Sequence, residues 1–100
     1  MATKVYISGP MTGYENFNYP AFNQAEERLK AAGHEVENPA KNPDPDPKTW
    51  ENFMRMALKQ LCECDIVVVL PGWEKSRGAV IEVGLAETLG MKVYEIGEMV

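Results

Sequence analysis

The sequence predicts an α/β protein in which helices cover both faces of a small parallel sheet, a three-layer sandwich of the flavodoxin-like or Rossmann-like kind. Two observations predict this fold. Strand-like stretches alternate with stretches of helical period along the chain. The stretch from Asp65 to Leu70 contains three consecutive valines and nothing polar after its first residue, which is typical of a strand buried on both faces. With right-handed crossovers, we expect about four strands in the order 2-1-3-4.

The composition predicts one domain covering residues 1–100. Of the 100 residues, 45% are hydrophobic and 25% are charged, which is enough for one core without disulfides. No apolar run reaches the ~20 residues that a membrane span needs, and the N-terminus lacks a secretory hydrophobic region, so we expect a cytoplasmic protein without a membrane partner. A net charge of −5 argues against a nucleic-acid polymer as partner, although backbone N–H groups can still hold a small anion.

The cysteines and the histidine predict no metal and no cofactor. Cys62 and Cys64 are separated by one residue, which is too close for an ordinary disulfide and matches no zinc spacing, so we expect a structural or incidental role for them. His34 is the only histidine. It stands at a turn into a strand, where a surface role is more common than catalysis or metal binding.

The first strand is expected over Lys4–Ile7, and Ser8-Gly9-Pro10-Met11-Thr12-Gly13 follows it at once. Two glycines and a proline directly after a strand form either a simple turn or a loop whose backbone approaches a ligand. The pattern is neither a Walker loop nor the dinucleotide fingerprint.

A helix is expected from Tyr19 or Pro20 to Ala32, with Gly33 as its C-terminal cap. Its apolar face consists of Phe22, Ala25, Leu29 and Ala32. The stretch His34–Glu37 is short and partly polar, which predicts an edge strand.

The segment Asn38–Lys48 carries four prolines and has no regular period. We expect an extended surface loop that acts either as a lid or as a mobile connector. Thr49 then caps a helix whose apolar residues repeat at three- and four-residue steps and are expected to face the core. These residues are Trp50, Phe53, Met54, Ala57, Leu58 and Leu61.

The central strand, Asp65–Leu70, is followed by a short loop and a helix expected from Ser76 to Leu89, with Gly90 past its end. The helix residues expected to face inward are Val80, Ile81, Leu85 and Leu89. A last strand is expected over Met91–Ile96.

In open parallel sheets, ligands bind beyond the carboxyl ends of the strands. The order 2-1-3-4 places the first and third strands side by side. Their loops, Ser8–Gly13 and Pro71–Gly78, are therefore expected to form opposite walls of one crevice.

Glu82 is the candidate reactive group in this crevice. It lies in the second turn of its helix, where the helix dipole favours the ionised carboxylate. An ionised carboxylate without a salt bridge can attack or stabilise an electron-poor carbon, as in glycosyl transfer. The alternative is a glutamate that faces solvent. Ser76 is the expected N-cap, and Gly78 leaves room for a ligand.

Trp73 has three possible roles: stacking on a nucleobase, covering the sheet edge or joining a subunit contact. Lys75 and Arg77 either meet a phosphate or are solvated. Asp65 is set aside, because six strand residues at about 3.3 Å each place it nearly 20 Å from the ligand edge.

Three sequence elements together resemble the nucleoside 2-deoxyribosyltransferase-like superfamily, over nearly the whole chain. They are Tyr6-Ile7-Ser8-Gly9-Pro10-Met11, Cys64-Asp65 and Ser76-x-Gly78-x-x-x-Glu82. The superfamily includes transferases and 2′-deoxynucleoside 5′-monophosphate N-glycosidases. The similarity is closest to small phage and prophage proteins of unknown function, which share the run Leu-Pro-Gly-Trp-Glu-x-Ser-x-Gly-Ala.

The resemblance implies that Glu82 is the nucleophile that takes the deoxyribosyl group and that Tyr6 supports it. It implies a small nucleoside or nucleotide as partner, no cofactor, and a homodimer or dimer-based assembly with shared sites. Further residues are implied to bind the substrate: Ser8, Gly9, Met11 and Gly13 in the first loop, and Ser76 and Gly78 at the sugar or its 5′ side.

The chain departs from the enzymes of the superfamily at Ala57. The enzymes carry an aspartate there, eight residues ahead of the equivalent of Asp65, and a general acid–base contribution of typically ~10²–10⁴-fold would be missing without it. The protein would then use another group, such as Glu74 or Asp44, or bind a nucleotide or an ADP-ribose-like ligand without turnover. A third hypothesis is an interaction protein that uses the crevice and Trp73 for self-association.

Overall fold

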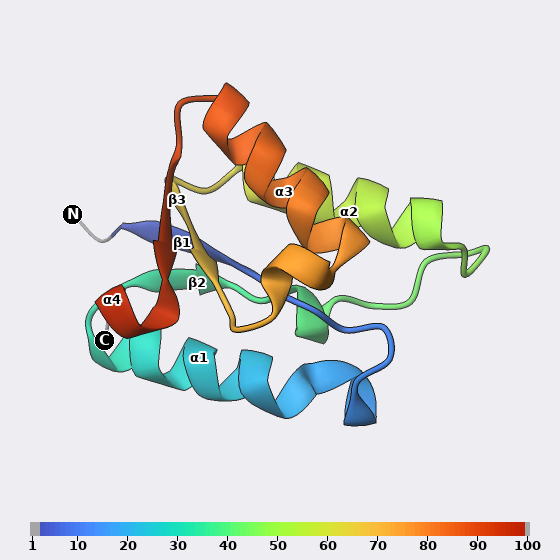
Figure 1. The fold of residues 1–100 in the computed structure, drawn as a ribbon, viewed down its shortest axis with the longest axis horizontal. Coiled ribbons are helices and arrows are strands. Elements are labelled where there is room, and N and C mark those ends of the chain that lie inside the picture. The colour runs from blue at the N-terminus through green and yellow to red at the C-terminus, as the bar shows by residue number, and fades with distance from the viewer. Residues whose placement is uncertain (1–2, 100) are drawn as a thin grey trace.

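The computed structural model describes residues 3–99 and contains a four-stranded sheet in the order β2-β1-β3-β4 (Figure 1). The strands are Lys4–Ser8 (β1), Glu35–Glu37 (β2), Ile66–Val69 (β3) and Lys92–Glu95 (β4). Every neighbouring pair is parallel, with Tyr6 beside Val67 and Ser8 beside Val69 across β1 and β3. The predicted fold class and strand order are therefore confirmed.

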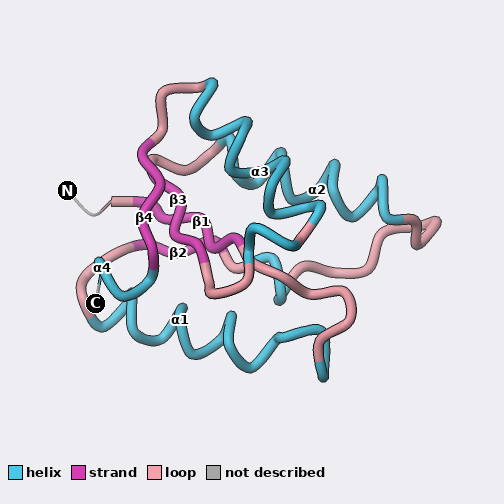
Figure 2. The backbone as a smooth tube through the Cα atoms, viewed as in Figure 1, coloured by secondary structure: helices cyan, strands magenta, loops and turns pink. Residues whose placement is uncertain are grey.

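Helices cover both faces of the sheet (Figures 1 and 2). On one face lies α1 (Tyr19–Ala31), and on the other lie α2 (Trp50–Cys62) and α3 (Arg77–Thr88). A short helix, α4 (Ile96–Met99), begins where the last strand was expected to continue, and it packs on the α1 side. Three 3₁₀ turns lie in the connections: Glu15–Asn18 (η1), Pro39–Lys41 (η2) and Trp73–Lys75 (η3).

Alternation along β1 divides the core into two clusters, because successive side chains of a strand point to opposite faces. Val5 and Ile7 pack toward α1, whereas Tyr6 points toward α2 and α3. The cluster on the α1 face contains Val5, Ile7, Phe22, Ala25, Leu29, Val68 and Leu70. The cluster on the other face contains Tyr6, Ala57, Leu61, Cys64, Val67, Val69, Val83 and Ala86.

The predicted N-caps of α2 and α3 and the glycine turn after α1 are confirmed. The Thr49 hydroxyl accepts a hydrogen bond from the Asn52 N–H at 3.1 Å and caps α2, and the Ser76 hydroxyl accepts one from the Ala79 N–H at 3.2 Å and caps α3. Gly33 has a left-handed backbone with φ +94°, which lets the chain turn after α1.

The predicted inward face of α3 is wrong. Val80, Ile81 and Leu89 are 47%, 40% and 54% exposed, and Leu85 is only partly buried. The buried residues of α3 are instead Ala79, Glu82, Val83 and Ala86. Because α3 has apolar residues on all sides, its period defines no single stripe, and the small side chains decide which face can approach the sheet closely.

Two smaller predictions are also wrong. Phe53 on α2 is 40% exposed, whereas Ala57 and Leu61 form the buried face of that helix. Ala32 is exposed, because α1 ends one residue before it and the chain is already turning toward Gly33.

The proline-rich segment begins as a structured turn rather than an extended loop. Asn38 is buried, and its side-chain NH₂ donates to Glu26 at 2.9 Å and to Asn23 at 3.0 Å. Lys41 also reaches Glu26, at 2.8 Å. Burial raises the pKa of Glu26, but the bonds from Lys30, Lys41 and Asn38 outweigh burial and bring it down to about 2. The ionised Glu26 therefore ties the start of this segment to α1.

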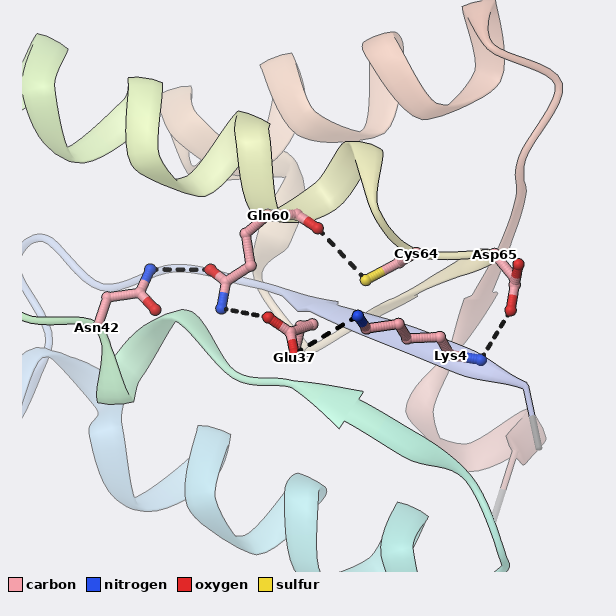
Figure 3. Close-up of polar contacts among 6 residues, drawn as sticks. All are labelled: Lys4, Glu37, Asn42, Gln60, Cys64 and Asp65. Carbon is pink, nitrogen blue, oxygen red and sulfur yellow. Dashed lines mark hydrogen bonds and ion pairs between the residues drawn. The ribbon is translucent and has the colours of Figure 1, made fainter.

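A second polar network links the edge strand to α2 and β3 (Figure 3). Gln60 accepts a hydrogen bond from Asn42 at 2.8 Å and donates one to Glu37 at 3.1 Å. The buried Cys64 thiol donates to the Gln60 carbonyl at 3.4 Å, and burial raises the pKa of this thiol to about 12. Cys64 thus stays protonated and packs, as predicted for it.

Candidate active site

Glu82 lies in the second turn of α3 and points inward, toward the sheet. It is 6% exposed, so the alternative of a solvent-facing glutamate is wrong. The helix starts at the Ser76 cap, and the buried Ala79 and Val83 share the inward face with Glu82. The cap and the small inward residues together hold the carboxyl group against β1.

Two hydroxyl groups of β1 hold the Glu82 carboxyl group. The Tyr6 hydroxyl donates to Oε2 at 2.5 Å, and the Ser8 hydroxyl donates to Oε1 at 2.7 Å. Tyr6 and Ser8 are both fully buried, and they point to the same face because they are two residues apart on one strand. Within residues 3–99, Glu82 forms no ion pair.

The ionisation of Glu82 differs from the expectation drawn from its place on the helix. Burial raises its pKa to about 7, and the hydrogen bonds from Tyr6 and Ser8, which lower the pKa, do not cancel the effect of burial. Near neutral pH the group is therefore divided between its neutral and ionised forms, instead of being fully ionised. The pKa of Tyr6 is raised well above its usual value, chiefly by burial, so Tyr6 remains a donor.

A carboxyl group of this kind has two chemical uses. Its ionised form can attack an electron-poor carbon, and its neutral form can donate a proton to a leaving group. Its place is also informative, because the loops after β1, β2 and β3 and the first turns of α1, α2 and α3 lie at the same end of the sheet (Figure 2). Ligands of parallel α/β proteins bind at this end.

The loops after β1 and β3 lie against each other, as the strand order predicts. The Leu70 N–H donates to the Ser8 carbonyl at 2.9 Å. A Cβ atom added to Gly9 would lie 2.9 Å from the Leu70 Cβ, and one added to Gly72 would lie 2.6 Å from the Tyr14 hydroxyl oxygen. The close approach of Gly9 to the buried Leu70 thus depends on a residue without a Cβ atom, whereas the exposed Tyr14 side chain can turn away from position 72.

The other residues expected to bind substrate lie in several places. Met11 packs against the cluster on the α1 face, on the other side of the sheet from Glu82, and Gly13 is exposed. The Ser76 hydroxyl is engaged in capping α3. A Cβ atom added to Gly78 would lie 3.1 Å from the Met54 Sδ, so this glycine lets α3 approach α2. Among the described residues, only Tyr6 and Ser8 form side-chain hydrogen bonds with Glu82.

Trp73 covers the sheet. It is partly buried and packs against the cluster that contains Tyr6 and Val83. It also lines a hollow of about 310 Å³ near the ends of β3 and β4. The other lining residues of this hollow are Val69, Val83, Glu87, Val93, Tyr94, Glu95 and Glu98.

The charged residues that the sequence offered as further site candidates have partners of their own or are solvated. The Arg77 guanidinium lies 3.8 Å over the Trp50 ring, a cation–π contact that joins the starts of α2 and α3. Lys75 and Glu74 are exposed, and the exposed Asp44 forms an ion pair with Lys48 at 3.1 Å. Sequence reasoning missed the Trp50–Arg77 contact, because the two residues are far apart along the chain.

Glu82 does not line either of two surface hollows that the described residues form. The larger hollow, of about 740 Å³, lies at the start of α1 and is lined by Glu15, Asn16, Asn18, Pro20, Ala21, Asn23, Gln24 and Glu27. The smaller one is the hollow beside Trp73, where Val83, the neighbour of Glu82, forms part of the wall.

The described residues contain no grouping of three or more His, Cys, Asp or Glu side chains that could hold a metal ion. None of the helices within residues 3–99 has the length and hydrophobicity needed to cross a membrane.

The fold is shared with solved structures of other α/β proteins. The chain shares its fold with the 2-deoxyribosyltransferase from Bacillus psychrosaccharolyticus, with a TM-score of 0.72 and 23% identity over 92% of this chain and 70% of that one. It shares it also with the 2-desoxiribosyltransferase from Leishmania mexicana, with a TM-score of 0.73 and 18% identity over 93% of this chain and 63% of that one.

The chain belongs to the family described as "Domain of unknown function (DUF4406)", which it matches over residues 3–95. A sequence search among curated proteins gives no match.

Proposed function

We propose that this protein cleaves or transfers at the N-glycosidic bond of a deoxynucleoside or a deoxynucleoside 5′-monophosphate, with Glu82 as nucleophile. The observation that carries the proposal is the buried Glu82 carboxyl group, bound by Tyr6 and Ser8 at the carboxyl end of β1. The likeness of the protein's fold to two 2-deoxyribosyltransferases supports the class of substrate.

In the proposed reaction, an ionised Glu82 oxygen attacks C1′ of the deoxyribose. The C1′–O ester bond forms while the C1′–N bond breaks, and the electron pair of that bond passes to the base nitrogen, which takes up a proton from solvent water. Water, or the nitrogen of a second base, then displaces Glu82 from C1′. The bonding pair returns to the carboxylate, and the attacking group releases its proton to solvent.

The surroundings of Glu82 suit the two halves of this cycle. Tyr6 and Ser8 donate hydrogen bonds to the carboxyl oxygens and hold them in one orientation, so that little reorganisation is needed before attack. A carboxylate whose pKa is about 7 is also a better base than an ordinary one and is half ionised near neutral pH.

A second candidate function is a non-catalytic module that binds a nucleotide or an ADP-ribose-like ligand. Ala57 favours it: the residue is 8% exposed and packs in the same cluster as Tyr6. No carboxylate is present at this position to assist a leaving base.

One experiment separates the two functions. The pure protein is incubated with a panel of deoxynucleosides and deoxynucleoside 5′-monophosphates, and free base is measured by chromatography for wild type, Glu82→Gln and Glu63→Gln. Glu63 is an exposed glutamate at the end of α2 and serves as the matched control. Base release that Glu82→Gln abolishes and Glu63→Gln retains supports the enzyme. No release, together with a nucleotide-dependent rise in Tm, supports the binding module. If neither response is observed, both functions are contradicted, and self-association through the crevice and Trp73 remains.

We further propose that the protein works in the cytoplasm as a homodimer formed through the outer face of α3. Val80 and Ile81 are large, exposed and apolar on this face, and Gly84, with open space around it, lies between them and Thr88. Large apolar side chains that are exposed side by side favour contact with a second copy of the same face. The free thiols of Cys62 and Cys64 are typical of a reducing compartment.

A further inference from the structure

Ser8 is an unusual residue for its position in the sheet. It is the last residue of β1, it is fully buried, and it lies beside Val69 of β3. The Ser8 carbonyl accepts a hydrogen bond from the Leu70 N–H at 2.9 Å, so the backbone of Ser8 is held by β3. A buried hydroxyl group without a partner is costly, and the partner here is Glu82 Oε1, 2.7 Å away.

The two hydroxyl groups that bind Glu82 lie at different positions along β1. Ser8 is two residues beyond Tyr6 on β1, which at about 3.3 Å per residue is roughly 7 Å closer to the carboxyl end of the strand. Ser8 is thus the donor at the ligand-binding end of the sheet, and Tyr6 holds the other oxygen from deeper in the core.

We propose that Ser8 is a positioning residue for Glu82: its hydroxyl group orients Oε1 at the carboxyl end of β1 and stabilises the ionised carboxylate. The use of that carboxylate in glycosyl chemistry rests on the proposed function. The effect of Ser8 on the titration of Glu82 does not, because it follows from the hydrogen bond alone.

No charged side chain competes with Ser8 for this effect within the described residues. Tyr6 is the only titratable group that hydrogen-bonds to Glu82, and the buried Cys64 of the same cluster stays protonated. Lys4, at the other end of β1, lies 4.0 Å from Glu37. The charged residues of α3 and of the elements packed on it are exposed: Glu51, Arg55, Lys59, Glu74, Lys75, Arg77, Glu87, Lys92 and Glu95.

The direction of the effect follows from which form of Glu82 accepts the bond. A hydroxyl group donating to a carboxylate favours the charged form, so its removal makes Glu82 bind its proton more tightly. Hydrogen bonds to charged groups are strong enough that losing one lowers the ionised fraction below neutral pH by about 10- to 100-fold. A serine that only filled space would leave the titration unchanged.

The test is a direct titration of the Glu82 carboxyl carbon by ¹³C NMR in glutamate-labelled protein, with Glu82→Gln to assign the signal. In Ser8→Ala the midpoint is expected to shift to higher pH, and in Ser8→Thr, which restores a hydroxyl group, it is expected to return toward the wild-type value. Equal midpoints in Ser8→Ala and wild type would overturn the proposal. If Ser8→Ala does not fold, Ser8→Cys keeps the volume with a weaker donor and carries the same comparison.

A pH–rate profile separates this proposal from the proposed function. If base release is found, its rising limb should move to higher pH in Ser8→Ala and back in Ser8→Thr. A shifted NMR midpoint in a protein that releases no base would reject the proposed chemistry while leaving the positioning role of Ser8 intact. An unshifted NMR midpoint, in a protein whose wild type releases base, would reject the positioning role of Ser8 and leave the proposed chemistry intact.

Discussion

Glu82 is surrounded by apolar side chains and held by two hydroxyl groups, and these two kinds of neighbour act in opposite directions on its proton. Burial raises its pKa from 4.5 to about 7, and the bonds from Tyr6 and Ser8 lower it by less than burial raises it. The folded protein therefore binds this proton more tightly than the unfolded chain does. The consequence is a pH dependence of stability that belongs to one residue.

We expect the free energy of unfolding to fall as the pH rises from about 4.5 to about 7, because the unfolded chain releases the Glu82 proton first. The stabilisation is complete below pH 4.5 and is lost as the pH passes the folded pKa of about 7. At about 1.4 kcal/mol per pH unit, this contribution is on the order of 3 kcal/mol.

Urea unfolding of wild type and Glu82→Gln at pH 5 and pH 7.5 measures this contribution. The free energy of unfolding of wild type, relative to that of Glu82→Gln, should be higher at pH 5 than at pH 7.5. The amide side chain of the variant does not titrate and so serves as the reference. A difference that stays constant with pH would mean that Glu82 is not perturbed in the folded protein.

At the scale of the elements, the connections after β1 and β3 come together at one end of the sheet. The loops after β1 and β3 meet where Gly72, with φ +86°, lies against the Tyr14 hydroxyl group. Gly13 also has φ +86°, but a Cβ atom added there would meet nothing within 4 Å. The two glycines share a backbone conformation and differ in their contacts, which makes them a matched pair.

Gly13→Ala is expected to cost about 1–2 kcal/mol of stability, the usual cost of a left-handed backbone in a residue with a Cβ atom. Gly72→Ala should cost slightly more, because its new methyl group also displaces the Tyr14 hydroxyl group, the exposed end of a side chain that can turn away. Urea denaturation of both variants measures the difference, and adding Tyr14→Phe to Gly72→Ala should recover part of it. Equal losses of stability at the two positions would mean that the new methyl group at position 72 meets no resistance from the Tyr14 side chain.

At the scale of the whole molecule, the outer face of α3 exposes large apolar side chains that a second copy of the chain could cover. Val80 and Ile81 are among the large exposed apolar residues, on a helix whose inward face is occupied by small residues and Glu82. Burying a charge in a dimer contact is costly, so one glutamate on this face should prevent association.

Size-exclusion chromatography with light scattering should therefore give twice the chain mass for wild type and the single-chain mass for Ile81→Glu. Ala31→Glu places the same charge on an exposed position of α1 and should leave the dimer intact. A monomeric wild type would reject the dimer, and a dimeric Ile81→Glu would move the interface to another surface.

Much of the fold could be predicted from short stretches of sequence. The valine run of β3 indicated a central strand, and the polar β2 indicated an edge strand. The hydroxyl groups of Thr49 and Ser76 marked the starts of α2 and α3. These features depend on neighbours within a few residues, so local patterns carry them. The observed strand order is the expected one, but alternation and right-handed crossovers limit the possible orders without selecting this one.

The surroundings of Glu82 were decided only by the tertiary structure. Ser8 and Glu82 are 74 residues apart, and only the packing of α3 on β1 makes the serine at the end of β1 the hydrogen-bond donor of a buried glutamate. The inward face of α3 was decided in the same way, because an almost wholly apolar helix has no stripe of its own. The chain by itself thus determined which elements form and in what order, while the packing of distant elements decided the burial, the charge and the partners of its central carboxyl group.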